Sequence, residues 1–253
     1  MPYTLKKSLG QHFLNDVQIV HKIKAVLEQQ PISQLLEVGP GAGALTQYIH
    51  TIPTVSFKAI EIDREKVMYL IQTYPFLKDK LILSDILETA LPFDKEFIVV
   101  GNFPYNISTQ IVFKILSWKQ HMPMMVGMFQ KEVAERIAAK PNSKAYGILS
   151  VLTQAFYDVT YLFDVPPTAF TPPPKVMSGV IQLKRKNEFP SFASEKLFFH
   201  LVKMAFGQRR KMLRNPLKPY FSATQLQEPI FTKRAENLTF EDFAALTFKM
   251  HNS

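Results

Sequence analysis

The sequence contains no cysteine. This absence excludes disulfide bonds, zinc sites built from thiolates and a cysteine nucleophile. Long apolar runs are also missing, because no stretch is long enough to cross a bilayer. The first seven residues, Met-Pro-Tyr-Thr-Leu-Lys-Lys, lack the apolar core of a secretion signal. We therefore expect a cytoplasmic protein, and the sequence predicts no metal site.

Acidic residues are fewer than basic ones. The chain has 21 Asp and Glu residues against 30 Lys and Arg residues, a formal net charge of +9. This balance favours a polyanionic partner, either nucleic acid or an anionic membrane surface. With 253 residues, 47% of them hydrophobic, the chain can form one large domain or a large domain with a small appendage. We expect a monomer.

Strand and helix patterns alternate through the first half of the chain. Apolar runs typical of strands occur at residues 34–38, 55–60, 80–83, 97–100 and 124–129. Helical spacing of apolar residues occurs at 17–29, 44–50, 64–73 and 109–116. Strands that alternate with helices indicate a parallel sheet covered on both faces.

The pattern changes after residue 150. Residues 154–165 and 176–184 resemble strands, and the proline-rich loop between them predicts an antiparallel pair at the edge of the sheet. Residues 185–194 resemble a linker, and 195–253 read as short helices. We therefore predict an α/β domain with a doubly wound sheet at residues 1–187 and a small all-helical domain at 188–253.

Three of the nine glycines lie within Glu37–Gly43, between a predicted strand and a predicted helix. Glycines allow a tight turn there and let a ligand approach the backbone closely. Gly39, Gly41 and Ala44 also satisfy the loose dinucleotide-binding pattern. A purely structural turn is the alternative.

Acidic residues follow the next two strands. Glu61 comes 22 positions after Gly39 and could accept hydrogen bonds from ribose hydroxyls. Asp85 could accept one from an adenine amino group, or it could cap the turn that follows, while Asp63 is expected to cap a helix. The carboxyl ends of parallel strands share one edge, so these residues predict an adenosine-containing cofactor, either S-adenosylmethionine or NAD.

Asn102-Phe103-Pro104-Tyr105 follows the strand at 97–100. It resembles the Asn/Asp-x-Pro-aromatic motif of methyltransferases that act on exocyclic amino groups of nucleobases. The resemblance implies a Rossmann-like class I methyltransferase sheet and S-adenosylmethionine as cofactor. It also implies that the Asn102 side-chain oxygen and the Phe103 carbonyl accept hydrogen bonds from the target amino group, with Asn102 beside the cofactor. Pro104 would stiffen the turn and Tyr105 would stack on a flipped base.

Phe103 departs from the motif, which usually has a smaller aliphatic residue at this position. Only its backbone carbonyl has an implied role, so the departure changes little. A loop that simply buries an aromatic side chain is the alternative for the whole motif.

Further segments resemble the small-subunit ribosomal RNA adenine dimethyltransferases. They include SLGQHFL at 8–14, GNFPYNIST at 101–109, PNSKAYGILS at 141–150 and VPPTAFTPPPKV at 165–176, and the resemblance spans about residues 6–218. It implies that His12 and Leu14, in an amino-terminal arm, contact the cofactor. It also implies that Phe170 packs near the target base, although a core aromatic that anchors its loop is the alternative.

A basic segment lies between residues 203 and 218 and contains no acid. The nucleic-acid interpretation is a surface that contacts RNA phosphates, and a solvated helix face is the alternative. The predicted contacts are Lys203, Arg209, Arg210, Lys211 and Arg214, with Lys144 and Lys175 as additions.

Together these features predict an enzyme that dimethylates N6 of two adjacent adenosines near the 3′ end of 16S rRNA, within an assembling small subunit and without a membrane partner. Four alternatives remain open at this point. They are a large-subunit (23S) rRNA methyltransferase of the antibiotic-resistance type, a DNA adenine methyltransferase, an assembly factor whose binding matters more than methylation, and an NAD-dependent dehydrogenase.

Overall fold

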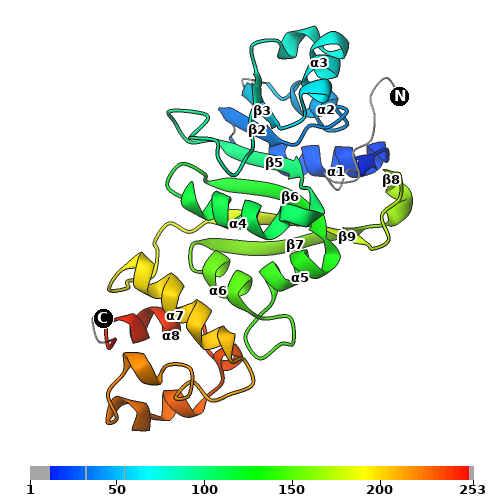
Figure 1. Cartoon of the computed structure of the whole chain (residues 1–253). Coiled ribbons are helices and arrows are strands. Elements are labelled where there is room, and N and C mark those ends of the chain that lie inside the picture. The colour runs from blue at the N-terminus through cyan, green and yellow to red at the C-terminus, as the bar shows by residue number, and fades with distance from the viewer. Residues whose placement is uncertain (1–11, 32, 54, 251–253) are drawn as a thin grey trace. The chain divides into compact units, whose positions relative to one another are not determined.

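The computed structural model describes residues 12–31, 33–53 and 55–250 (Figure 1). The chain forms two compact units. The first comprises the chain up to residue 134 together with 160–185, and the second comprises 135–159 and the residues from 186 onward. Residues 135–159 therefore belong to the second unit, whereas the sequence analysis placed them in the first domain.

A seven-stranded sheet organises the first unit. Its order is β4-β3-β2-β5-β6-β9-β7. The five strands from β4 to β6 pair in parallel, and β9 runs antiparallel to β6. This confirms the predicted fold class, a mainly parallel sheet with an antiparallel strand toward one edge. The strands are β2 (Gln34–Val38), β3 (Ser56–Glu61), β4 (Leu81–Leu83), β5 (Ile98–Asn102), β6 (Met124–Gln130), β7 (Tyr157–Val165) and β9 (Ser178–Arg185).

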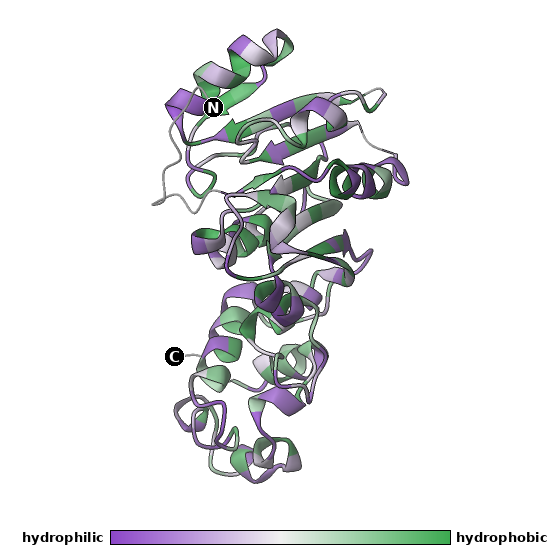
Figure 2. Ribbon diagram, turned by 90° about the vertical axis from the view of Figure 1, so that its right-hand side faces the viewer, coloured by the Kyte–Doolittle hydropathy of each residue, from purple (hydrophilic) through white to green (hydrophobic). Residues whose placement is uncertain are grey.

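Helices lie on both sides of this sheet (Figure 2). Asp16 caps the first of them, because its carboxylate accepts hydrogen bonds from the backbone N–H groups of Gln18 and Ile19. The helix then buries one apolar face, as its 3.6-residue spacing predicts. The helices of the first half of the chain are α1 (Val17–Glu28), α2 (Thr46–Ile49), α3 (Arg64–Thr73) and α4 (Ser108–Ser117).

The sequence analysis missed two helices, α5 (Lys131–Ala138) and α6 (Ile148–Gln154). The strand predicted to begin at residue 154 begins instead at Tyr157, so the start of that prediction was wrong. Gln154 ends α6, and its side-chain amide donates to the carbonyls of Ile137 and Ala139, at 2.9 and 2.8 Å. These contacts join segments 15 and 17 residues apart, which local apolar spacing cannot reveal.

The second unit is built from helices and short turns. α7 (Glu195–Gly207) buries Phe198, Leu201, Val202 and Ala205, and α8 (Phe240–Thr247) packs with it. Several 3-10 turns connect the two helices. This agrees with the short helices expected after residue 195. In the part of the chain that the structure describes, no helix has the length and apolar character needed to span a membrane.

The start of the described chain is held by the proline-rich loop. β1 (Phe13–Leu14) pairs antiparallel with β8 (Phe170–Thr171), with Leu14 opposite Phe170. The N–H of Asn15 donates to the carbonyl of Ala169 at 2.8 Å. Residues 12–14 of the predicted arm are therefore ordered against the loop, and the arm's residues 8–11 lie outside the described part.

Candidate active site

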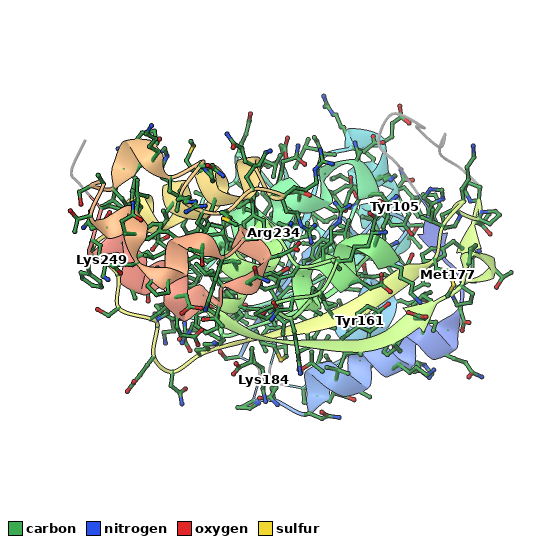
Figure 3. All side chains as sticks on the ribbon, turned by 90° about the horizontal axis from the view of Figure 1, so that it is seen from below. Tyr105, Tyr161, Met177, Lys184, Arg234 and Lys249 are labelled. Carbon is green, nitrogen blue, oxygen red and sulfur yellow. The ribbon has the colours of Figure 1, made fainter. Side chains whose placement is uncertain are left out.

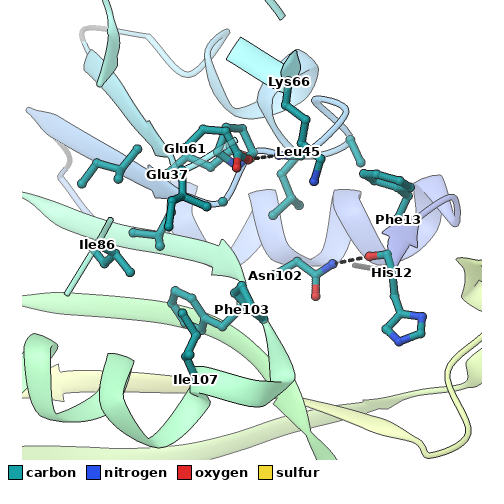
Figure 4. Close-up of a pocket in the computed structure, with 18 of the residues that line it drawn as sticks. His12, Phe13, Glu37, Leu45, Glu61, Lys66, Ile86, Asn102, Phe103 and Ile107 are labelled. Atoms are coloured by element: carbon teal, nitrogen blue, oxygen red, sulfur yellow. Dashed lines mark hydrogen bonds between the residues drawn. The ribbon is translucent and has the colours of Figure 1, made fainter. Parts of the chain in front are cut away.

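One pocket opens at the carboxyl ends of the parallel strands (Figure 4). Parallel strands deliver their carboxyl ends to the same edge, so residues far apart in sequence meet there. The structure places all seven predicted cofactor residues in its lining, namely His12, Leu14, Gly39, Gly41, Glu61, Asp85 and Asn102.

The glycine turn after β2 needs glycine at several positions. Gly39, Gly41 and Gly43 have φ of 70°, 60° and 86°, a region that side chains disfavour. A Cβ on Gly43 would also lie 2.5 Å from the Tyr74 ring. Along the pocket side, Gly39 and Gly41 present backbone without side chains. The turn therefore exposes main-chain groups to a ligand.

Glu61 connects this turn to the end of β3. Its two carboxylate oxygens accept hydrogen bonds from the N–H groups of Gly41, at 3.2 Å, and Asp63, at 3.0 Å. Asp63 in turn caps α3 by accepting from the N–H of Glu65, as expected. Each carboxylate oxygen has a further lone pair, so Glu61 can still accept hydrogen bonds from a ligand.

Asp85 serves the turn that follows it. Its carboxylate accepts a hydrogen bond from the N–H of Leu87 at 2.9 Å. This is the capping role that the sequence analysis kept as the alternative. The residue also lines the pocket, so capping and ligand contact are compatible at this position.

Glu37 is a pocket residue whose side chain the sequence analysis did not single out. It is buried at the end of β2, and the hydroxyl of Thr46 donates to its carboxylate at 2.7 Å. Burial, assisted by the negative charge of Glu61, raises the pKa of Glu37 to about 8, against the opposing effect of the Thr46 hydrogen bond. Its place directly before the glycine turn is the signal that could have drawn attention to it.

Asn102 ends β5 and faces the arm. Its side-chain nitrogen donates to the carbonyl of His12 at 3.0 Å. Figure 4 shows the amide nitrogen directed toward the arm and the oxygen away from it. A Cβ on Gly39 would lie 4.0 Å from the Asn102 carbonyl oxygen, so the glycine turn and the predicted catalytic motif abut. The amide group of Asn102 thus presents an acceptor within the pocket.

Two glycines accommodate the large residue that follows Asn102. The Phe103 ring is buried and packs on Phe129, with ring centroids 4.9 Å apart. A Cβ on Gly127 would clash with this ring, and a Cβ on Gly101 would lie 2.8 Å from it. The backbone N–H of Phe103 donates to the carbonyl of Met128 at 3.1 Å. The departure from the motif is therefore absorbed in the core and leaves the backbone of the turn in place.

Tyr105 is held from several directions. The His12 ring stacks on it, with centroids 5.4 Å apart and planes inclined by 30°. Its hydroxyl is hydrogen-bonded to the hydroxyl of Ser178, and burial raises its pKa. The hydroxyl of Ser108 donates to the carbonyls of Pro104 and Tyr105, both at 3.1 Å. The motif is consequently rigid on both its backbone and its aromatic side chain.

Phe170 differs from these residues in its environment. Its side chain is 3% exposed and belongs to the hydrophobic core, and it is not among the residues that line the pocket in the described chain. This placement matches the alternative of a core aromatic that anchors its loop. Its contact with a target base stays a prediction.

The predicted RNA contacts differ in environment. Six of the side chains are exposed, but Arg209 is half-buried and donates to the Glu236 carboxylate at 2.8 Å and to the Lys144 carbonyl at 2.7 Å. Arg209 therefore ties elements of the second unit together. The exposed residues are Lys144, Lys175, Lys203, Arg210, Lys211 and Arg214.

Comparison with known proteins decides which kind of enzyme uses this pocket. Residues 3–250 match the family model described as ribosomal RNA adenine dimethylase. The chain belongs to this family. The sequence-based prediction of an rRNA adenine dimethyltransferase is confirmed at this level, and the dehydrogenase and DNA methyltransferase alternatives are set aside.

Individual relatives align with this dimethylase over nearly the whole chain. It is 51% identical to "Ribosomal RNA small subunit methyltransferase A" of Flavobacterium johnsoniae over 249 residues, covering 97% of this chain and 95% of the relative. It is also 51% identical to the protein of the same name from Cytophaga hutchinsonii, covering 96% and 95%. The segments that carried the resemblance therefore belong to a match that extends through the second unit.

Solved structures show the same fold. A dimethyladenosine transferase from Plasmodium falciparum has a TM-score of 0.75 and 26% identity, covering 92% of this chain and 94% of that one. The 23S rRNA methyltransferase ErmE has a TM-score of 0.74 at 22% identity, covering 94% and 99%. The likeness to ErmE concerns the fold, so it does not favour a large-subunit substrate.

Proposed function

We propose that this protein transfers two methyl groups from S-adenosylmethionine to N6 of each of two adjacent adenosines near the 3′ end of 16S rRNA, in assembling small subunits. It acts as a cytoplasmic monomer. The observation that carries the chemistry is the amide of Asn102 in the same pocket as the glycine turn and Glu61. The relatives named for the small subunit, at 51% identity, support the choice of substrate.

The pocket fits S-adenosylmethionine. Gly39 and Gly41 offer bare backbone, and Glu61 offers lone pairs for the ribose hydroxyls. Asp85 lies in the same lining, where its carboxylate can accept from the adenine amino group, and His12 and Leu14 cover the pocket from the arm. When bound, S-adenosylmethionine supplies an electrophilic methyl group on a positively charged sulfur.

The residues of the motif prepare the nucleophile. The lone pair of the adenine amino group is delocalised into the ring, which makes the group a poor nucleophile. Hydrogen bonds to the Asn102 side-chain oxygen and the Phe103 carbonyl orient the N–H groups and localise this lone pair. A monomethylated base keeps one N–H, so one acceptor suffices for the second transfer. No strong general base is needed, and the rate comes from orientation and electrostatics.

Aromatic residues hold the target base. Tyr105 stacks on the base after it has been flipped out of its helix or loop. Phe170 supports the same base from the proline-rich loop, and because its side chain is buried, this contact requires a rearrangement around Phe170 when RNA binds. Pro172, Pro173 and Pro174 keep that loop stiff at low entropic cost.

A basic surface on the second unit binds the RNA backbone. Folding brings Lys233 and Arg234 beside the predicted cations, because Met212 and Arg234 form an antiparallel bridge and the N–H of Leu213 donates to the Lys233 carbonyl at 2.8 Å. Arg210, Lys211 and Arg234, the last labelled in Figure 3, line a shared hollow. Glu236 in the same lining accepts a hydrogen bond from Arg209. The exposed cations of this hollow, Arg210, Lys211 and Arg234, can therefore contact phosphates.

Methyl transfer from labelled S-adenosylmethionine tests the proposal directly. The acceptors are small subunits that lack the modification, with large subunits, naked rRNA and DNA in parallel. We expect label in small subunits alone, recovered as N6,N6-dimethyladenosine. Label in large-subunit RNA would instead assign the protein to the resistance-type enzymes, and no label in any acceptor would favour an assembly factor.

Two further measurements test the choice of cofactor and the role of methylation. S-adenosylmethionine should protect the protein against thermal unfolding at concentrations at which NAD does not. In cells that lack the protein, an Asn102→Ala variant that binds subunits without methylating them should fail to restore normal assembly if methylation is the main role. Full restoration by this variant would make binding the main role.

A further inference from the structure

The hydrogen bond between Tyr105 and Ser178 joins two distant parts of the first unit. The two hydroxyl oxygens lie 2.5 Å apart, although the residues are 73 positions apart in sequence. Ser178 is the first residue of β9 and is fully buried. A buried hydroxyl needs a hydrogen-bond partner, and here one of the two hydroxyl groups donates to the other.

The backbone around Ser178 is held by strand pairing and close packing. It pairs with Gln130 at the end of β6, and the neighbouring N–H of Lys131 donates to the Met177 carbonyl at 2.9 Å. Close packing of Tyr161 against Gly179 leaves no room for a side chain at the next position. The backbone of Ser178 therefore cannot shift without moving a strand whose residues 178–184 all pair with β6.

Tyr105 lies in a different setting. It follows β5 in a short 3-10 turn, and its ring can rotate about two side-chain bonds unless something holds it. The Ser108 hydrogen bonds hold the backbone of the turn, and the His12 ring covers one face. The bond to Ser178 holds the far end of the ring (Tyr105 is labelled in Figure 3).

We propose that Ser178 is a positioning residue that holds the Tyr105 ring in place for stacking on the target adenine. This inference rests on the function proposed above. The seven residues between Phe170 and Ser178 form the proline-rich loop, so one strand start anchors both this loop and the tyrosine. The two aromatic residues proposed to hold the base are thereby tied to one another through β9.

A double-mutant cycle tests the inference. The proteins are the unaltered chain, Ser178→Ala, Tyr105→Phe and the double variant, each assayed for methyl transfer to small subunits that lack the modification. We expect each single variant to lower kcat about tenfold, as the loss of one hydrogen bond that orients a reacting group does. The double variant should be no worse than either single one, because both remove the same bond.

Two readouts separate positioning from a merely structural role. The dissociation constant of S-adenosylhomocysteine, measured by calorimetry, should be unchanged in all variants, and the loss should fall on kcat more than on KM. Ser150→Ala is the matched control, since Ser150 is also a fully buried serine that donates to a backbone carbonyl, that of Arg136. It should lower the melting temperature by a similar amount without lowering kcat.

The outcomes are distinguishable. Additive losses in the cycle, or an unaltered kcat in Ser178→Ala, would overturn the inference and leave the proposed function intact. No labelling by the unaltered chain would overturn both. If Ser178→Ala fails to fold, Tyr105→Phe still decides, because it removes the same bond and keeps the ring, and an unaltered kcat there overturns the inference.

Discussion

The edge of the sheet and the basic surface of the second unit both contain residues that the sequence predicted to bind ligands. At the sheet edge, residues from the ends of four strands meet in one pocket, because parallel strands end on the same side. In the second unit, two residues that are adjacent in sequence have different environments. Arg209 is tied to Glu236, whereas Arg210 is exposed. The topology of a parallel sheet therefore predicts well which residues meet at its edge. A run of basic residues does not reveal which of its side chains stabilise the fold and which face the solvent.

Removal of the acceptor at the sheet edge should have the largest effect. We expect Asn102→Ala to lower kcat for methyl transfer by roughly 10²- to 10³-fold, as when one preorganised hydrogen-bonding group is removed from an active site. Single-turnover transfer to small subunits measures the loss. Asn187→Ala, exposed in the linker, should stay within about twofold. A mild effect of Asn102→Ala would mean that the pocket does not act through this residue.

The packing around the Phe103 ring can be tested by substitutions in the core. Gly127→Ala places a methyl group against the Phe103 ring and should destabilise the protein by about 1–3 kcal/mol, the usual cost of overpacking. Urea unfolding measures this change. A second substitution, Phe103→Leu, should restore part of the loss. Gly147→Ala is the matched control, since a Cβ there meets nothing within 4 Å, and an equal loss in both variants would contradict the packing argument.

The two neighbouring arginines should separate stability from binding. Arg209→Ala should lower the unfolding free energy by about 1 kcal/mol, because it removes hydrogen bonds of a charged group. Arg210→Ala should leave stability unchanged but weaken binding to small subunits and reduce the slope of log K against log salt by about one. Melting curves and binding titrations over a range of salt check both. Interchanged effects would show that the structure assigns these arginines wrongly.

The last prediction concerns pH. Because the pKa of Glu37 rises from its ordinary 4.5 to about 8 on folding, the folded protein binds a proton that the unfolded chain releases between these values. The contribution of Glu37 to stability is therefore largest below about pH 4.5 and declines as pH rises to about 8. Urea unfolding at pH 5.5 and 8.5 should show a decline that Glu37→Gln, which stays neutral, lacks. Equal pH dependence in both proteins would indicate that Glu37 is already ionised in the fold.

Much of the fold and the pocket could be predicted from local patterns. Gly39 and Asp85 follow strands and Glu61 and Asn102 end them, and a parallel sheet brings such positions to one edge whatever the details of packing. The helix cap at Asp16 was equally predictable, because capping involves neighbours within one turn. The sequence by itself therefore determined the sheet, the edge at which the pocket lies and the family resemblance of the Asn102–Tyr105 motif.

Other features depended on contacts that only the tertiary structure decided. The partners Tyr105 and Ser178 are 73 positions apart, and Arg234 joins Met212 across an intervening run of turns. Phe170 is buried against the arm rather than displayed in the pocket. Sequence spacing carries no information about such pairs, because side-chain burial and hydrogen bonding between distant segments are set by how the elements pack.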